Sequence, residues 1–321
     1  MKIIRFNHVQ PGLDPAEMSA RYQASLDMAA YADEAGFEIL TVEEHHGADN
    51  GWSPSPLVFA GMVFGRCPKI GISVSALLVP LHDPLRIAED IAVLDLASGG
   101  RLTVIAGLGY RPEEYAAHGK SWKDRGALMD ESLQVMLNAW TGEPFEYRGT
   151  TVKVTPRPLT QPHPLLLVGG TSKPAARRAA RLGLPMSPAA NMPELEAYYY
   201  EQCQELGTAG FCAMPMPGFS HVFVHEDPDQ AWAELGSYML HEATTYSAWQ
   251  TPDIKSAVHS HASTVDDLRA EGIYRILSPE ETIDMGKDGD FALHPLVGGM
   301  PIEDGWKSLR LFVDEVIPNL R

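Results

Sequence analysis

Residues 69–106 read KIGISVSALLVPLHDPLRIAEDIAVLDLASGGRLTVIA, and they contain one complete β–α–β unit. Apolar residues alternate with small or polar ones over 69–76, a period of two that predicts a strand. The Asp-Pro pair at 83–84 is typical of a helix start. The Gly-Gly pair at 99–100 predicts the end of that helix, before a second strand at 102–106. Parallel strands joined by a helix indicate an α/β fold.

The same alternation extends from this unit towards both ends of the chain. A strand pattern at 3–8 starts the series, and a helical pattern at 301–316 ends it. About eight such units follow one another without a linker, and eight β–α units close into a (β/α)8 TIM barrel. We therefore predict one barrel domain over residues 1–321, with insertions near 143–160 and 249–290. The first insertion is predicted to be a hairpin. The second insertion shows no clear helical or strand period over 249–272.

Composition restricts the classes of protein that the chain can be. Lys and Arg number 25 against 42 Asp and Glu, which gives a net charge of −17. Such a charge repels nucleic acid and anionic membranes. Three cysteines are too few for a disulfide framework. The longest apolar run is shorter than the ~20 residues that span a bilayer. We expect a soluble, cytoplasmic protein with neither nucleic-acid nor membrane partners.

The loop after the second predicted strand carries the densest set of reactive side chains. It reads Glu43-Glu44-His45-His46, and barrel enzymes place their active sites at the C-terminal ends of the strands. Carboxylates beside imidazoles provide acid and base groups near neutral pH. The same residue types also bind divalent metals, and a hydrogen-bonded loop without chemistry is a third interpretation.

Glycines follow two further predicted strands. Gly107-Leu108-Gly109 ends the fourth strand, and Gly169-Gly170-Thr171-Ser172 ends the fifth, directly before a helix. Glycine lets a planar ligand or a phosphate approach the backbone. A helix N-terminus favours an anion, so the second segment is a candidate phosphate cradle. Tight turning explains the first segment better than a ligand does, and ordinary helix capping explains the second segment equally well.

Several motifs together resemble the bacterial luciferase-like monooxygenase family, and the similarity extends over nearly the whole chain. The resemblance implies a (β/α)8 barrel that binds a flavin, usually reduced FMN or a deazaflavin, and that activates oxygen or exchanges hydride. The motifs are Glu44-His45-His46, LHDPLRIAED at 81–90, LDLASGGR at 94–101, PLLLVGGT at 164–171, and Gly298-Gly299-Met300 followed by Trp306 and Leu309.

The resemblance also implies roles for individual residues. His45 corresponds to the catalytic histidine of luciferases and Glu44 to a flavin-site glutamate. The implied cofactor contacts are Ser75 and Ala76, whose peptide can be cis against the flavin ring, Gly107 and Leu108 on the fourth strand, and Gly169, Gly170 and Thr171 on the phosphate side. Luciferase has an arginine where this chain has Leu108. The phosphate therefore needs another partner, such as Lys173, Arg177, Arg178 or backbone N–H groups.

We expect the reaction to join reduced FMN, O2 and a small organic substrate, with His45 giving or taking a proton near the flavin. Tyr110, Trp52 and Met300 are candidate substrate-wall residues. The acidic surface favours a neutral, mostly apolar substrate. The sequence lacks a G-x-G-x-x-G nicotinamide fingerprint, which suggests that a separate reductase supplies the flavin. Family precedent suggests a homodimer formed through helices of the second and third units.

Three other functions stay open at this stage. One is deazaflavin-dependent hydride transfer on the same fold. Another is a metal-dependent barrel hydrolase, and the third is a flavin-binding protein without catalysis. Candidate ligands for the hydrolase are His45, His46, Glu43 and Asp49, together with His221, His225, His259 and His261.

Overall fold

The computed structural model describes residues 2–250, 258–289 and 291–320. The chain divides into two compact units, which are described separately. The N/C unit comprises Met1–Pro54, Gly65–Ile70 and Met216–Arg321, and the central unit comprises Ser55–Phe64 and Gly71–Pro215.

The N/C unit is built on parallel strands. β1 pairs with β2 on one side and with β11 on the other, and β9 lies between β11 and β10. Most of their residues are apolar and buried, as expected for parallel strands covered on both faces. The strands are β1 (Ile3–Arg5), β2 (Ile39–Val42), β9 (His221–Val224), β10 (Tyr274–Leu277) and β11 (Ala292–Leu293).

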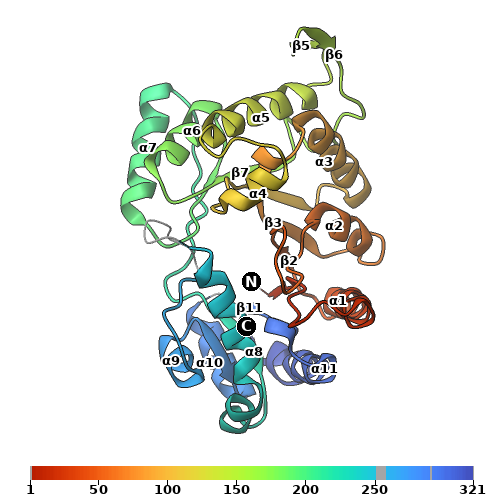
Figure 1. Cartoon of the computed structure of the whole chain (residues 1–321), viewed down its shortest axis with the longest axis vertical. Coiled ribbons are helices and arrows are strands. Elements are labelled where there is room, and N and C mark those ends of the chain that lie inside the picture. The colour runs from red at the N-terminus through yellow and green to blue at the C-terminus, as the bar shows by residue number, and fades with distance from the viewer. Residues whose placement is uncertain (1, 251–257, 290, 321) are drawn as a thin grey trace. The chain divides into compact units, whose positions relative to one another are not determined.

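Side-chain caps begin most helices of the N/C unit. Asp14 and Asp227 accept backbone N–H bonds at the starts of α1 and α8, and Thr264 and Ser278 form capping boxes at α9 and α10. Within this unit α1 contacts α11, and α8 contacts α9 (Figure 1). The helices are α1 (Pro15–Glu34), α8 (Pro228–Ala248), α9 (Val265–Glu271), α10 (Pro279–Asp288) and α11 (Ile302–Leu311), followed by a π-helical turn at Phe312–Val316.

The central unit has a second set of parallel strands and one hairpin. β4 lies between β3 and β7, and β8 pairs with β7. The predicted insertion is an antiparallel hairpin of β5 and β6, which projects at the top of Figure 1. The strands are β3 (Gly71–Leu77), β4 (Leu102–Ala106), β5 (Phe145–Tyr147), β6 (Thr150–Val152), β7 (Leu165–Gly169) and β8 (Met186–Ser187).

Helices connect the strands of the central unit. Asp83 caps α3 as predicted, and Gly99 ends it in the left-handed conformation. α3 contacts both α2 and α5, and α6 packs against α7. The helices are α2 (Pro56–Phe64), α3 (Pro84–Ser98), α4 (Pro112–Ala117), α5 (Arg125–Trp140), α6 (Lys173–Leu182) and α7 (Pro193–Leu206).

Most predicted strands and helices are present in the structure, although the first strand ends at Arg5 and not at residue 8, and the helix α4 was not predicted. The largest difference lies in one region. Residues 249–272 were expected to be irregular, but α9 occupies 265–271. β10 then pairs with β9, so the region up to 290 contributes a strand to the parallel sheet. The prediction failed because α9 and β10 are short, and neither is long enough to establish a period. Residues 251–257 lie outside the described part of the chain.

Among the described helices, none combines the length and the apolar character that crossing a membrane requires.

Candidate functional site

The loop after β2 folds back on itself and brings His45 close to Trp52. The backbone N–H of His45 donates to the carbonyl of Ser53 over 3.0 Å. The rings of His45 and Trp52 meet edge to face, with centroids 5.4 Å apart. His45 is only 5% exposed. The predicted catalytic histidine and one predicted substrate-wall residue are therefore neighbours within the N/C unit.

The two carboxylates of this loop have different partners. The Trp52 indole N–H donates to Glu43 Oε1 over 3.1 Å, and Arg5 donates to the same carboxylate. Glu44 Oε1 lies 2.9 Å from Nε2 of His46. Glu43 therefore orients the indole, while Glu44 pairs with the second imidazole of the loop.

The end of α8 and the residue that follows it add two aromatic rings beside His45. Ring centroids of Tyr246 and Trp249 lie 5.8 and 5.0 Å from that of His45. They lie 5.4 and 5.1 Å from that of Trp52. We call Trp52, Tyr246 and Trp249 the aromatic cluster. It surrounds the imidazole with apolar surface, an arrangement that sequence reasoning did not find because α8 is far from His45 in the chain.

Glu43 of this loop belongs to a buried ion network. Arg5 at the end of β1 donates to Glu43 and, over 2.9 Å, to Glu242 of α8. Glu242 also accepts from the Tyr274 hydroxyl over 3.0 Å and from the Gly298 N–H over 2.8 Å. Burial would raise the pKa of Glu242, but His294 and Arg5 hold that pKa well below its usual range. The carboxylate is therefore ionised and fully partnered.

Arg5 is the residue by which the sequence could have revealed this buried ion network. A charge at the end of a short, apolar strand is rarely buried without a partner. Its partners lie 38 and 237 residues away, so the sequence does not reveal which carboxylates they are.

A second histidine of the N/C unit is held neutral. His8 stacks on Tyr22, and its Nε2 lies 3.0 Å from the Ser25 hydroxyl. Burial, aided by the charge of Arg21, lowers the pKa of His8 to about 3. Arg21 also donates to the backbone carbonyl of Met300 over 2.8 Å. The Met300 side chain is fully buried in the hydrophobic core around α8, and its substrate-wall role stays a prediction.

The predicted cofactor residues lie in the central unit. The Ser75–Ala76 peptide is cis, and the register between β3 and β4 shifts at this point. The N–H of Gly107 donates to the carbonyl of Leu77 over 2.8 Å. A Cβ atom on Gly107 would lie 2.7 Å from that of Ala76. The structure thus brings three of the predicted flavin contacts together where β3 and β4 end.

The residues after Gly107 belong to a short connection that leads to α4. The Tyr115 hydroxyl of α4 donates to the carbonyl of Leu108 over 2.5 Å. The Leu108 and Tyr110 side chains are half-buried. The roles predicted for Leu108 in flavin contact and for Tyr110 in the substrate wall stay predictions.

The predicted phosphate cradle follows β7. A Cβ on Gly169 would lie 2.9 Å from Ile105 of β4, and Gly170 has φ +130°. Gly170 therefore needs glycine because of its backbone conformation, and Gly169 needs it because β4 lies so close. Thr171 is half-buried before α6, and within the described residues the Ser172 hydroxyl makes no capping bond to the first turn. The backbone N–H groups in the first turn of α6 therefore need an acceptor other than the Ser172 hydroxyl.

The cations considered for the phosphate differ in availability. Arg178 is buried and its Nε donates to Asp130 over 2.8 Å, so it is already paired. Lys173 begins α6, is exposed, and lies over the ring of Tyr198. Arg177 is exposed. Lys173 and Arg177 remain the cationic candidates.

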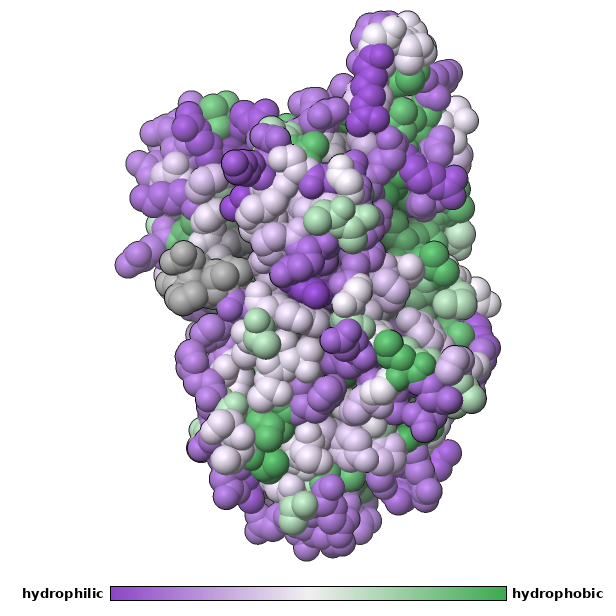
Figure 2. All heavy atoms as spheres, viewed as in Figure 1, coloured by the Kyte–Doolittle hydropathy of each residue, from purple (hydrophilic) through white to green (hydrophobic). Residues whose placement is uncertain are grey.

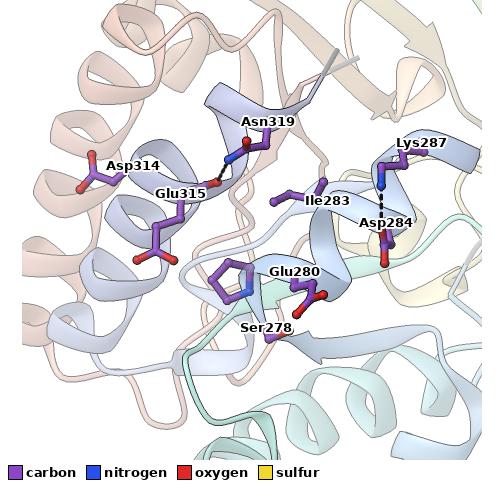
Figure 3. Close-up of a pocket in the computed structure, with 9 residues that line it drawn as sticks. Ser278, Glu280, Ile283, Asp284, Lys287, Asp314, Glu315 and Asn319 are labelled. Carbon is purple, nitrogen blue, oxygen red and sulfur yellow. Dashed lines mark hydrogen bonds and ion pairs between the residues drawn. The ribbon is translucent and has the colours of Figure 1, made fainter.

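Two other features bear on the alternatives. In the ranges that the structure describes, no three His, Cys, Asp or Glu side chains converge as metal ligands. The metal-dependent hydrolase therefore has no ligand set there. A surface hollow of about 700 Å³ lies beside α10, and four of its nine lining residues are carboxylates (Figure 3). Its residues are Ser278, Pro279, Glu280, Ile283, Asp284, Lys287, Asp314, Glu315 and Asn319, and none of them is a predicted site residue.

Comparison with curated proteins gives partial matches to named enzymes. The alkanal monooxygenase beta chain of Vibrio harveyi is 28% identical over 197 residues, which cover 57% of this chain and 59% of the relative. An uncharacterised protein of Sinorhizobium fredii, y4wF, is 31% identical over 183 residues, covering 56% of this chain and 53% of that protein. The chain thus spans about half the length of the curated relatives it matches.

Solved structures match over the whole chain. Monooxygenase RslO1 of Streptomyces bottropensis has a TM-score of 0.77 at 26% identity, covering 100% of both chains. The oxygenating constituent of 3,6-diketocamphane monooxygenase of Pseudomonas putida, solved with FMN, has a TM-score of 0.68 at 17% identity, covering 100% of this chain and 98% of its own. An F420-dependent secondary alcohol dehydrogenase has a TM-score of 0.66 at 18% identity, with coverages of 100% and 98%.

The strands, the helices and these neighbours define the class of protein, an α/β protein with the luciferase-like (β/α)8 barrel fold. This confirms the fold class expected from the sequence. The family model described as luciferase-like monooxygenase matches residues 1–290. The chain therefore belongs to the luciferase-like monooxygenase family.

Proposed function

We propose that the chain is a flavin-dependent monooxygenase that uses reduced FMN and O2 to oxidise a small, mostly apolar organic molecule. The observation that carries this proposal is the environment of His45. An imidazole that is 5% exposed lies among the rings of Trp52, Tyr246 and Trp249. A proton-transfer group in apolar surroundings suits a redox reaction that water would otherwise divert.

Residues of the central unit suit a flavin mononucleotide. The strand ends near Ala76 and Gly107 present backbone and small side chains, and a side chain on Gly107 would collide with Ala76. A planar ring needs such a surface. The start of α6, with Thr171 and exposed Lys173, offers N–H groups, a hydroxyl and a cation for a phosphate. We assign Ser75, Ala76, Gly107 and Leu108 to the ring, and Gly169, Gly170, Thr171 and Lys173 to the phosphate.

Each part of the chain has a separate task in this proposal. When bound, the reduced flavin supplies the electrons that reduce oxygen. The aromatic cluster excludes water from His45, and Glu43 keeps the indole of Trp52 in place through its hydrogen bond. His45 donates or accepts the proton that the reaction moves. Glu44 helps to fix the loop that carries His45, because its Oε1 lies 2.9 Å from Nε2 of the adjacent His46.

We infer that a separate reductase supplies the reduced FMN. The structural neighbour from Pseudomonas putida is described as an oxygenating constituent and contains FMN, which supports both the cofactor and the division of labour. The F420-dependent neighbour shares the fold at 18% identity, and the neighbour that contains FMN does so at 17%. A test must therefore compare the two cofactors directly.

Anaerobic titration with reduced FMN and with reduced F420, followed by mixing with oxygen, tests the proposal. We expect tight binding of reduced FMN, weaker binding of oxidised FMN, and oxygen uptake when a flavin reductase regenerates the cofactor. Preference for F420 without oxygen uptake would instead support hydride transfer. Binding of FMN without oxygen uptake, unchanged in His45→Ala, would support a non-catalytic flavin protein.

We also infer that the chain forms a homodimer through α2 and α3. Val58 and Met62 of α2 are 64% and 42% exposed, and Val93 and Leu96 of α3 are 50% and 42% exposed. Figure 2 shows hydrophobic side chains gathered over these two helices. An apolar surface of this kind is typical of a protein interface. Sedimentation of Val93→Glu should give a monomer, and Leu206→Glu, on exposed α7 surface, should keep the wild-type mass.

A further inference from the structure

We propose that the organic substrate is a neutral compound with a planar aromatic ring, which binds against the aromatic cluster beside His45. This inference rests on the proposed function and narrows its substrate class. Trp52, Tyr246 and Trp249 all have ring centroids within 6.3 Å of one another and within 5.8 Å of His45. A pocket for an aliphatic chain needs no such concentration of rings.

The ring orientations suit an aromatic ligand. Tyr246 and Trp52 form T-shaped pairs with His45 at interplanar angles of 75° and 84°, whereas Trp249 is tilted by 49°. Aromatic pairs gain roughly 0.5–1.5 kcal/mol from edge-to-face or offset geometry, beyond the burial of their area. An aliphatic ligand of equal hydrophobicity gains the burial alone. Rings at several angles therefore discriminate between ligands by shape and quadrupole.

One ring of the cluster is held in place by a hydrogen bond, and the other two are half-buried. Trp52 is 2% exposed, and its N–H is bound to Glu43, which is itself paired with Arg5. Tyr246 and Trp249 are half-buried at the end of α8. A rigid platform with two partly exposed rings is suited to receive a further ring, because a prepared surface reduces the ordering cost of binding.

Charge selects the neutral form of the ligand. Glu43 and Glu44 are buried within a few residues of His45, and the whole chain carries a net charge of −17. An anionic aromatic acid would be repelled by these carboxylates. The cationic groups near the loop are already engaged, since Arg5 is paired with two carboxylates.

Calorimetric titration of the flavin-free chain with 2-naphthol and with 1-octanol, two neutral probes of similar hydrophobicity, tests the inference. We expect 2-naphthol to bind roughly tenfold more tightly, the value of one good aromatic contact. Trp249→Leu should weaken 2-naphthol several-fold and leave 1-octanol unchanged. Tyr246→Leu is the second variant, and circular dichroism verifies that both are folded.

Trp306→Leu is the matched control. Its indole lies in the same unit but packs against Tyr31 and Arg310, so neither probe should respond. Equal affinity for the two probes, equal weakening of both by Trp249→Leu, or competitive displacement of 2-naphthol by FMN would overturn the inference. The direct probe titrations contain no flavin, so they are independent of flavin binding. Intact probe selectivity together with a failed flavin-binding experiment would contradict only the proposed cofactor. Intact flavin binding without probe selectivity would sink only the aromatic substrate.

Discussion

The N/C unit and the central unit carry their predicted chemistry on different kinds of groups. In the N/C unit the groups are charged and aromatic side chains in mutual contact, such as Arg5, Glu242 and Trp52. In the central unit they are backbone and small residues, such as Ala76 and Gly107. Buried charges depend on their partners, whereas a backbone surface depends on the absence of side chains. The N/C unit should therefore be sensitive to atoms removed, and the central unit to atoms added.

Glu242→Ala is expected to have the largest effect. It leaves Arg5 with one carboxylate fewer and removes the acceptor of the Tyr274 hydroxyl and the Gly298 N–H. Breaking a buried ion pair on one side costs about 3–5 kcal/mol. The free energy of unfolding, measured by urea denaturation at pH 7, should fall by that amount.

An exposed ion pair is the control for this prediction. Asp229 pairs with Arg269, and its side chain is 82% exposed. Asp229→Ala should therefore change stability by less than about 1 kcal/mol. If Glu242→Ala were as mild as this control, the buried network would contribute no more than a surface contact, and the contrast between the units would fail.

Gly107→Ala tests the opposite sensitivity in the central unit. The new Cβ would lie 2.7 Å from Ala76 Cβ, so β3 and β4 must move apart. Overpacking of this kind costs about 1–3 kcal/mol. Gly126→Ala in α5 is the control, since its Cβ would meet Arg178 only at 3.6 Å, and no loss is expected. A stable Gly107→Ala variant that still bound FMN would show that the added methyl is accommodated, against the proposed ring surface.

The two units also differ in how far their structure could be predicted from sequence. Residues of the central unit follow local rules: the bounds of β4, the start of α6 directly after Ser172 and the cap at Asp83 were predicted as the structure has them. The network of the N/C unit depends on pairings between distant residues, such as Arg5 with Glu242. Helical periodicity can reveal a helix such as α8, but it contains no information about which side chain of that helix meets Arg5 or His45.

His45→Ala tests the predicted catalytic residue. Its ring packs on other rings, so we expect folding to be retained. Turnover, measured as oxygen uptake with reductase-supplied FMN, should fall roughly tenfold or more because a positioned acid–base group is lost. His225→Ala is the matched control, since that imidazole bonds to the Asp227 backbone. Equal turnover in the two variants would remove His45 from the reaction.

His8→Asn tests whether a buried imidazole of the N/C unit stays neutral among the buried charges of that unit. Burial and Arg21 lower the pKa of His8 to about 3, whereas an unfolded histidine has a pKa near ~6.5. The unfolded chain therefore binds a proton below about pH 6.5 that the folded chain refuses, and stability is lost as the pH falls towards 3. From pH 7 to pH 6 this loss amounts to about 0.7 kcal/mol.

Asparagine tolerates the left-handed backbone of His8, whose φ is 59°, and does not titrate. The stability deficit of His8→Asn relative to the unmodified protein should therefore shrink by about 0.7 kcal/mol between pH 7 and pH 6. Urea denaturation at the two pH values measures this difference. The other buried imidazoles, His221 and His294, are present in both proteins, so their titration cancels. A deficit that stayed constant or grew on acidification would mean that the folded protein protonates His8. Arg21 and burial would then be too weak to keep that ring neutral.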